Sequence, residues 1–385
     1  MKNKEIIERL FIFGNGFDLS CGLKSSYSDF FEDIFILNPT TYGEDSKNNF
    51  WLRLFKELST YSDSPLNNWT DIETQILLQL KNIEFLFDSF LILNLGNLED
   101  GSSLKSKIAN EIDRPTTKMK SILNVDSVLI TYQLLKKEYN SFEIKQINEI
   151  QQRLKEDLIQ LEEYFQVYLT KHLSSKLEVN VPIHDIATRL FDYRYRTSSL
   201  IDHLTRQYSG YNSIDYYLSF NYTSPYKNKL IRNIHGTLEK GNIIFGIDYD
   251  KAKNNFNKPP IEFTKSYRIL ENKAISTVNI SNDLDYICFY GHGLGEADYS
   301  YFQSIFDSVD LYHGKTKLVF YWTQFGNSNQ YSIQVERVTN LIEKYGQTFT
   351  NKDHGRNLFT KLLLENRIIF NYVNLNEVLK EYCFK

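Results

Sequence analysis

Residues 10–18, with the sequence LFIFGNGFD, decide the fold, because four apolar residues run directly into a pair of glycines. A short apolar strand that ends in a glycine turn is typical of the start of α/β nucleotide-binding folds. The turn does not complete a standard phosphate motif. Leu19 stands where a dinucleotide fingerprint needs its third glycine, and no Gly-Lys pair follows at Walker A spacing. The stretch therefore predicts an α/β fold and disfavours a classical dehydrogenase or P-loop ATPase.

The second half of the chain carries further short apolar runs of this kind. They are near-continuous rather than alternating, which is typical of strands covered on both faces of a parallel sheet. The first predicted strand is residues 10–13. The later ones are residues 216–220, 231–234, 243–245, 286–290, 318–322 and 368–373.

The segment between these two parts, residues 46–210, has the periodicity of helices. Apolar side chains recur three and four positions apart over residues 72–87 and 144–165. Residues 95–120 are polar and contain glycines and a proline, so we expect a loop there.

A Rossmann-like α/β fold accounts for this order of elements. Residues 1–45 and 211–385 are expected to form one mostly parallel sheet with its covering helices. Residues 46–210 would then be a large helical insertion that separates the first strand from its sheet partners.

The composition restricts the function. The 385 residues include 44 Lys+Arg and 48 Asp+Glu, a formal net charge of −4, which disfavours general nucleic-acid binding. The three cysteines stand far apart, so we expect neither a disulfide framework nor a metal site. The most apolar run, residues 85–95, is about half as long as a membrane-spanning helix. Because the N-terminus is also too charged for a signal peptide, we expect a cytoplasmic protein without membrane partners.

Small polar signatures follow most of the predicted strands. Asn221 comes directly after residues 216–220, His235 and Gly236 follow residues 231–234, and residues 291–298 (GHGLGEAD) follow residues 286–290. Ligands of open parallel sheets bind beyond the carboxyl ends of the strands. We therefore expect these ends to converge with residues 14–18 on one crevice.

The residue types suggest roles within that crevice. A neutral imidazole titrates near ~6.5, so His235 is either a candidate base or a histidine that hydrogen-bonds a nearby carbonyl. The Asn221 amide both donates and accepts, so it either orients a water or ribose hydroxyl or caps a following helix. Gly14 and Gly16 either admit a phosphate close to the backbone or simply make a tight turn.

These motifs together resemble the AbiH-type bacteriophage abortive-infection proteins. The resemblance runs from about residue 9 to about residue 325 and implies a bacterial anti-phage effector with a phage-derived trigger or partner protein. The residues that carry it are 10–20 (LFIFGNGFDLS), 22–30 (GLKSSYSDF), Trp69-x-Asp71-x-Glu73, 220–223 (FNYT), 234–236 (IHG) and 291–302 (GHGLGEADYSYF).

The same motifs are similar to a diverged sirtuin-type nucleotide fold. Residues 14–16 resemble the sirtuin Gly-Ala-Gly loop, and Asn221 and His235 stand where sirtuins carry their catalytic Asn and His. The four-Cys zinc site of sirtuins has no counterpart here. The resemblance therefore implies hydrolysis of NAD, as the substrate, to nicotinamide and ADP-ribose without a metal.

The resemblance also implies the site residues. Asn221 and His235 would be catalytic, with Asn221 positioning the water or ribose and His235 acting as general base. Trp69 and Glu73, four apart on a predicted helix, either cover the crevice or belong to the core. The residues expected to bind the nucleotide are Gly14, Asn15, Gly16, Phe17, Asp18, Gly236, Gly291, His292, Gly293 and Asp298.

Two other functions stay open. One is a nucleotide-sensing regulator that binds in the crevice without turnover. The other is a nuclease-type toxin, although neither PD-(D/E)xK spacing nor a paired-His site is present. The expected partners are a small-molecule nucleotide and a phage-derived protein, and a homo-oligomer is compatible with the sequence.

Overall fold

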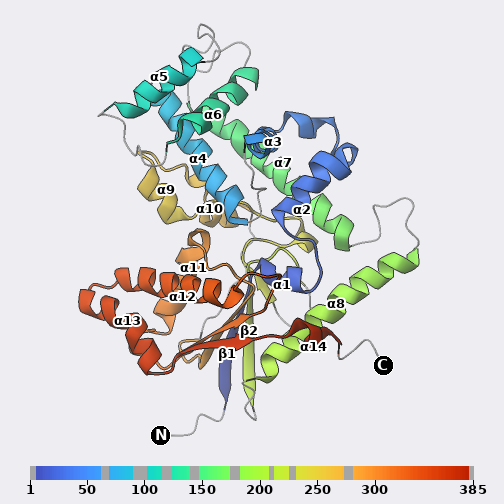
Figure 1. Ribbon diagram of the computed structural model, residues 1–385, viewed down its shortest axis with the longest axis vertical. Helices are drawn as coiled ribbons and strands as arrows, with labels where there is room; N and C mark the ends of the chain where they lie inside the picture. Colours follow the sequence, from blue (N-terminus) through green and yellow to red (C-terminus); the bar gives the residue numbers. More distant parts are fainter. Residues whose placement is uncertain are drawn as a thin grey trace. The chain divides into compact units, whose positions relative to one another are not determined.

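The chain forms two compact units, which we call the sheet unit and the helical unit (Figure 1). The computed structural model describes residues 6–61, 69–89, 102–114, 123–138, 147–173, 183–207, 212–224, 231–272 and 281–380. The sheet unit comprises Met1–Ser25, Leu169–Ile243 and Asn272–Lys385, and the helical unit comprises Ser26–Tyr168 and Ile244–Glu271.

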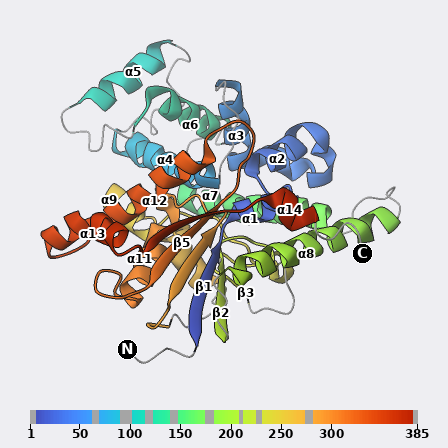
Figure 2. The ribbon, with the colours of Figure 1, turned by 60° about the horizontal axis from the view of Figure 1, so that its bottom comes forward.

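The sheet unit is built on six parallel strands in the order β3-β2-β1-β4-β5-β6 (Figure 2). The strands are β1 (Ile7–Phe13), β2 (Ser213–Ser219), β3 (Ile231–Asn233), β4 (Tyr286–Tyr290), β5 (Lys317–Trp322) and β6 (Ile368–Tyr372). This is the strand order of Rossmann folds. All strands are parallel, and the order in which successive strands are added to the sheet reverses between β1 and β4. The predicted fold class is confirmed.

Strand β1 begins earlier than predicted because a charged residue is buried in it. The Arg9 side chain is 1% exposed, and its Nε donates to Asp215 Oδ1 on β2 at 2.8 Å. A buried, paired guanidinium is compatible with an interior strand. Hydrophobic patterning alone places the start of the strand after a charged residue such as Arg9.

Helices cover both faces of the sheet. Leu10 and Ile12 of β1 pack on one face, and Phe11 and Phe13 on the other, as the alternation of a strand requires. The first face is covered by α11 (Tyr299–Ser308), α12 (Gln330–Gln347) and α13 (Lys352–Leu364). The second is covered by α1 (Asn15–Ser20), α8 (Ile183–Arg206) and α14 (Leu375–Lys380).

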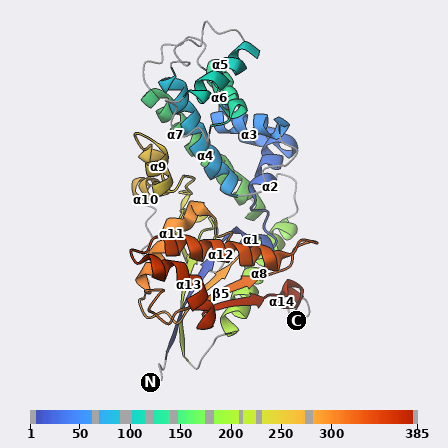
Figure 3. The ribbon, with the colours of Figure 1, turned by 60° about the vertical axis from the view of Figure 1, so that its left-hand side comes forward.

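The helical unit contains no strand among its described residues, and α6 packs against α3, α4 and α5 (Figure 3). Its α-helices are α2 (Tyr27–Glu32), α3 (Phe50–Tyr61), α4 (Trp69–Asp88), α5 (Ser102–Asp113), α6 (Val125–Glu138), α7 (Ile147–Leu173), whose last turn belongs to the sheet unit, α9 (Tyr249–Asn255) and α10 (Lys265–Glu271). The short helical turns of the two units are η1 (Asp33–Leu37), η2 (Pro39–Tyr42), η3 (Glu44–Asn48), η5 (Leu238–Lys240), η6 (Ile261–Phe263) and η7 (Glu296–Asp298).

Two local predictions are wrong. Residues 243–245 form no strand, and Ile247 makes only an isolated bridge to Thr264. The run is apolar because it is buried: Phe245 packs on Tyr27 and Phe165, with ring centroids 5.4 and 5.7 Å away. The loop expected over residues 95–120 contains α5, whose Leu104 and Ile108 are buried four positions apart.

A buried ion pair joins α7 to the segment that returns late in the sequence. Arg268 donates from Nη1 to Glu162 Oε1 at 2.6 Å and from Nη2 to Oε2 at 3.0 Å, and the Phe245 amide donates to Oε1 at 2.6 Å. Both side chains are at most 4% exposed. Burial raises the pKa of Glu162 to about 7, against the opposing effect of Arg268. The pair therefore fixes where residues 244–271 attach within the helical unit.

No helix in the described part of the chain combines the length and the apolar character needed to cross a membrane. Trp69 begins α4, but its side chain lies outside the described residues. The Glu73 carboxylate pairs with Lys265, which is buried.

We predict that Glu162→Leu lowers the free energy of unfolding by about 3–5 kcal/mol, because it leaves the Arg268 guanidinium buried and unpaired. The double variant Glu162→Leu/Arg268→Met removes both charges and should lose markedly less. Urea unfolding of the two variants measures the difference. Equal losses in the single and double variants contradict the prediction.

Candidate functional site

The loops that follow β1 and β4 lie against each other through their backbones. The Gly14 amide donates to Tyr290 O at 3.1 Å, and the Gly16 amide donates to Gly291 O at 2.8 Å. A Cβ atom on Gly14 would lie 2.6 Å from His292 Cα, and one on Gly16 would lie 2.7 Å from Gly291 Cα. Side chains are therefore excluded at both positions by the neighbouring loop, whatever binds there.

Gly291 is constrained in the same way from the other side. Its φ of +69° lies in the left-handed region, and a Cβ there would lie 2.3 Å from Phe17 N. Phe17 itself is buried and packs against Phe13, with ring centroids 4.5 Å apart. Gly293 differs, since it is exposed and nothing lies within 4 Å of the Cβ position. Gly293 thus leaves room beside its backbone, unlike Gly14, Gly16 and Gly291.

Asn221 holds the β1 loop from the end of β2. Its side chain is 4% exposed, and Nδ2 donates to Gly14 O at 3.1 Å. Asn233, at the end of β3, donates in turn from Nδ2 to Asn221 O at 2.6 Å and to Thr223 O at 2.8 Å. Asn233 was not predicted as a site residue, although it lies in the predicted strand 231–234, two residues before His235.

Asp18 lies at the centre of a buried network rather than at the surface. It is 1% exposed, and its two carboxylate oxygens accept from Thr223 Oγ1 at 2.7 Å and from the Tyr193 hydroxyl at 2.9 Å. Burial raises the pKa of Asp18 from 3.8 to about 6, although the bonds from Thr223, Tyr193 and Asn221 oppose this shift. Tyr193 could not be found from sequence, because α8 is distant in the chain.

One carboxylate lies between two imidazoles at the carboxyl edge of the sheet. Asp298 Oδ2 is 3.3 Å from His292 Nε2, and Oδ1 is 3.7 Å from His235 Nε2. His292 Nδ1 accepts the Leu294 amide at 2.9 Å, so the neutral ring carries its proton on Nε2, toward Asp298. The Phe220 ring lies edge-on to both imidazoles, with centroids 5.6 Å from His235 and 4.5 Å from His292.

Most of the predicted site residues thus meet along one edge of the sheet unit. The contacts link Gly14, Gly16, Asn221, Gly291 and His292, and through Asp298 they reach His235.

Two predicted residues are engaged with other parts of the chain. Asn15 accepts a hydrogen bond from Ser25 Oγ at 2.5 Å. Gly236 has a φ of +83°, and a Cβ there would lie 1.9 Å from Asn242 O, so it serves a tight turn. In the described ranges no group of three or more His, Cys, Asp or Glu side chains is placed to hold a metal ion.

The sheet order and this edge define a Rossmann-like α/β protein with a candidate site at the β1–β4 switch point. Residues 10–322 match the family model described as bacteriophage abortive infection AbiH, and the chain belongs to this family. The predicted family is confirmed, and with it a role in abortive infection. Comparisons with curated proteins and with solved structures gave no match.

We predict that Gly14→Ala and Gly16→Ala unfold at a clearly lower temperature than the parent chain, because each Cβ would collide with backbone of the β4 loop. The matched control is Gly293→Ala, whose Cβ meets open space at an exposed position. It should change the melting temperature little. Thermal melts of the three variants test this, and equal behaviour of all three would show that the loops are not in contact.

We predict a specific pH dependence for Asp18→Asn. The folded carboxyl has a pKa of about 6 against 3.8 for the ordinary group, so between these values the folded chain binds more protons than the unfolded chain. The Asp18 contribution to stability therefore falls as pH rises from about 4 to about 6, by on the order of 3 kcal/mol. Denaturant unfolding at pH 4.5 and 7.5 should show the substituted chain gaining stability relative to the parent at the higher pH. A difference that is constant with pH contradicts the assignment.

Proposed function

We propose that the protein acts in abortive infection by hydrolysing NAD to nicotinamide and ADP-ribose at the carboxyl edge of its sheet. The observation that supports this best is the Asp298 carboxylate between His235 and His292, next to the point where the strand order reverses. Open parallel sheets bind their ligands at such a point.

The reaction asks little of the protein beyond positioning. The bond from the ribose C1′ to the nicotinamide nitrogen breaks, and its electron pair passes to that positively charged nitrogen. Nicotinamide therefore leaves as a neutral molecule, which makes it a good leaving group. The remaining centre is oxocarbenium-like, and a water attacks it. In the proposal His235 takes the proton of that water, and Asp298 orients the imidazole and stabilises its charged form.

The contacts give the other predicted residues supporting roles. Asn221 acts as a positioning residue, because its amide holds the Gly14 carbonyl. Gly293 is the place where a nucleotide has room to approach the backbone, since nothing lies beside its Cβ position. Asp18 stabilises the loop through Thr223 and Tyr193 and does not itself meet the nucleotide.

Nucleotide binding without turnover is the second candidate function. The burial of both imidazoles supports it, since His235 is 4% exposed and His292 is 9% exposed. Side chains with so little surface give a reacting water little access. A regulator that only senses a nucleotide requires no such access.

We predict that His235→Ala and Asp298→Asn each lower nicotinamide release by roughly two to four orders of magnitude, the range for a positioned base. The double variant should lose much less than the product of the two losses, because the residues act as a unit. The matched control is His313→Ala, since His313 also pairs with an aspartate, Asp310, but both side chains are about two-thirds exposed. This control should keep full turnover.

The assay incubates purified protein with NAD and follows free nicotinamide by chromatography, with thermal melts to confirm folding. NAD binding without nicotinamide release favours the regulator. If the protein neither binds NAD nor releases nicotinamide, both candidate functions are overturned. Protection of cells against phage is the readout if the purified protein is inactive, and folded variants that keep full protection contradict a role for the site.

A further inference from the structure

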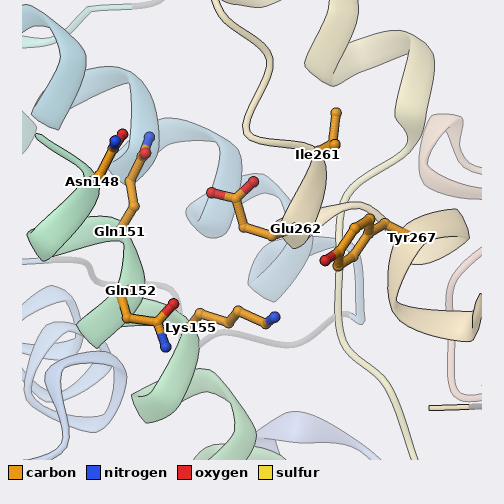
Figure 4. Close-up of a pocket in the computed structure, with 7 residues that line it drawn as sticks. All are labelled: Asn148, Gln151, Gln152, Lys155, Ile261, Glu262 and Tyr267. Atoms are coloured by element: carbon orange, nitrogen blue, oxygen red, sulfur yellow. The ribbon is translucent and has the colours of Figure 1, made fainter. Parts of the chain in front are cut away.

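The helical unit contains a pocket of about 320 Å³ that is separate from the residues of the proposed reaction (Figure 4). One wall is a single face of α7, where the lining residues recur at three- and four-residue spacing over a length of about 10 Å. The other wall is formed by η6 and α10. The lining residues are Asn148, Gln151, Gln152, Lys155, Ile261, Glu262 and Tyr267.

Several polar groups in this pocket have no partner among the described residues. Within the described part of the chain, the side chains of Asn148, Gln151 and Glu262 make no hydrogen bond or ion pair. Figure 4 shows the Glu262 carboxylate directed toward the α7 face that carries Gln151. A carboxylate and two amide oxygens are thus available as acceptors around one cavity.

The pocket is lined by one cation, Lys155, and one anion, Glu262, and the carboxylate of Glu271, which is bonded to Lys155, brings the local net charge to −1. The Lys155 ammonium is already bonded to Glu271 Oε1 at 2.6 Å and lies 5.5 Å from the centroid of the Tyr267 ring. Among the residues that the structure describes, no cation is bonded to the Glu262 carboxylate. A site of this sign repels phosphates and attracts cations. A single carboxylate is also too few ligands for a divalent metal ion.

We propose that this pocket binds an alkylammonium group. The ammonium would donate to Glu262 and to the amide oxygens of Gln151 and Asn148. Its aliphatic stem would lie along Ile261 and the Tyr267 ring, which are 43% and 37% exposed. Free polyamines and lysine side chains of a partner protein share this chemistry. The inference does not depend on the proposed NAD reaction, because it uses none of its residues.

The test is isothermal titration calorimetry on the full chain. The probes are putrescine, spermidine and the capped tripeptide acetyl-Gly-Lys-Gly-amide, with neutral 1,4-butanediol as a comparison. An ammonium probe should bind and the diol should not. Glu262→Gln keeps the shape and removes the charge, so it should weaken binding by about tenfold to a hundredfold.

The matched control is Glu336→Gln, which changes the net charge equally at an exposed position of α12. It should leave binding unchanged. Equal weakening by both variants means a diffuse surface field and overturns the proposal, as does equal binding of the diol or failure of every ammonium probe to bind. Binding of the amines alone identifies a free polyamine, and binding of the peptide alone identifies a lysine side chain. Thermal melts establish that each variant is folded.

Discussion

The backbone contact between the β1 and β4 loops is the constraint on which the candidate site depends. Gly14, Gly16 and Gly291 approach so closely that a Cβ on any of them would overlap a backbone atom of the other loop. In many α/β folds the glycines after the first strand serve a bound phosphate. Here the packing of the β1 loop against the β4 loop is enough to require glycine at these positions. The glycine pair is therefore evidence for the close contact of the two loops at the switch point. The proposal that a nucleotide binds there depends on the neighbouring residues instead.

That geometry is maintained by polar groups that are themselves buried. Asn221 and Asp18 each use their side chains on other parts of the chain, so both contribute to the site by holding its loops. Buried polar networks are costly unless every member is bonded, which ties the local fold to these residue types. Three titratable side chains, those of His235, His292 and Asp298, meet at this edge from the loops that follow β3 and β4.

The sequence predicted the sheet well because near-continuous apolar runs are typical of strands covered on both faces. It failed at residues 243–245 because burial against aromatic rings of a helical core produces the same pattern. It predicted that His235 and residues 291–298 share one edge, since strand ends meet at one edge of a parallel sheet, and Asp298 Oδ1 lies 3.7 Å from His235 Nε2. It could not find Tyr193 as a partner of Asp18, because only the folded chain brings α8 to that loop.

The family match covers the part of the chain that contains the candidate site and leaves out the outer part of the sheet beyond β5. Residues 10–322 run from within β1 to the end of β5, and they include every residue of the candidate site. Beyond the match lie α12, α13, β6 and α14. Strand β6 extends the sheet past β5, α12 and α13 cover one of its faces, and α14 packs on the other. Phe370 of β6 packs on Phe320 of β5, with ring centroids 5.7 Å apart. In strand order β6 is two positions from β4, so this outer part supports burial of the sheet while the matched part supplies the switch point. All the residues that support the proposed function therefore lie within the part of the chain that matches the family.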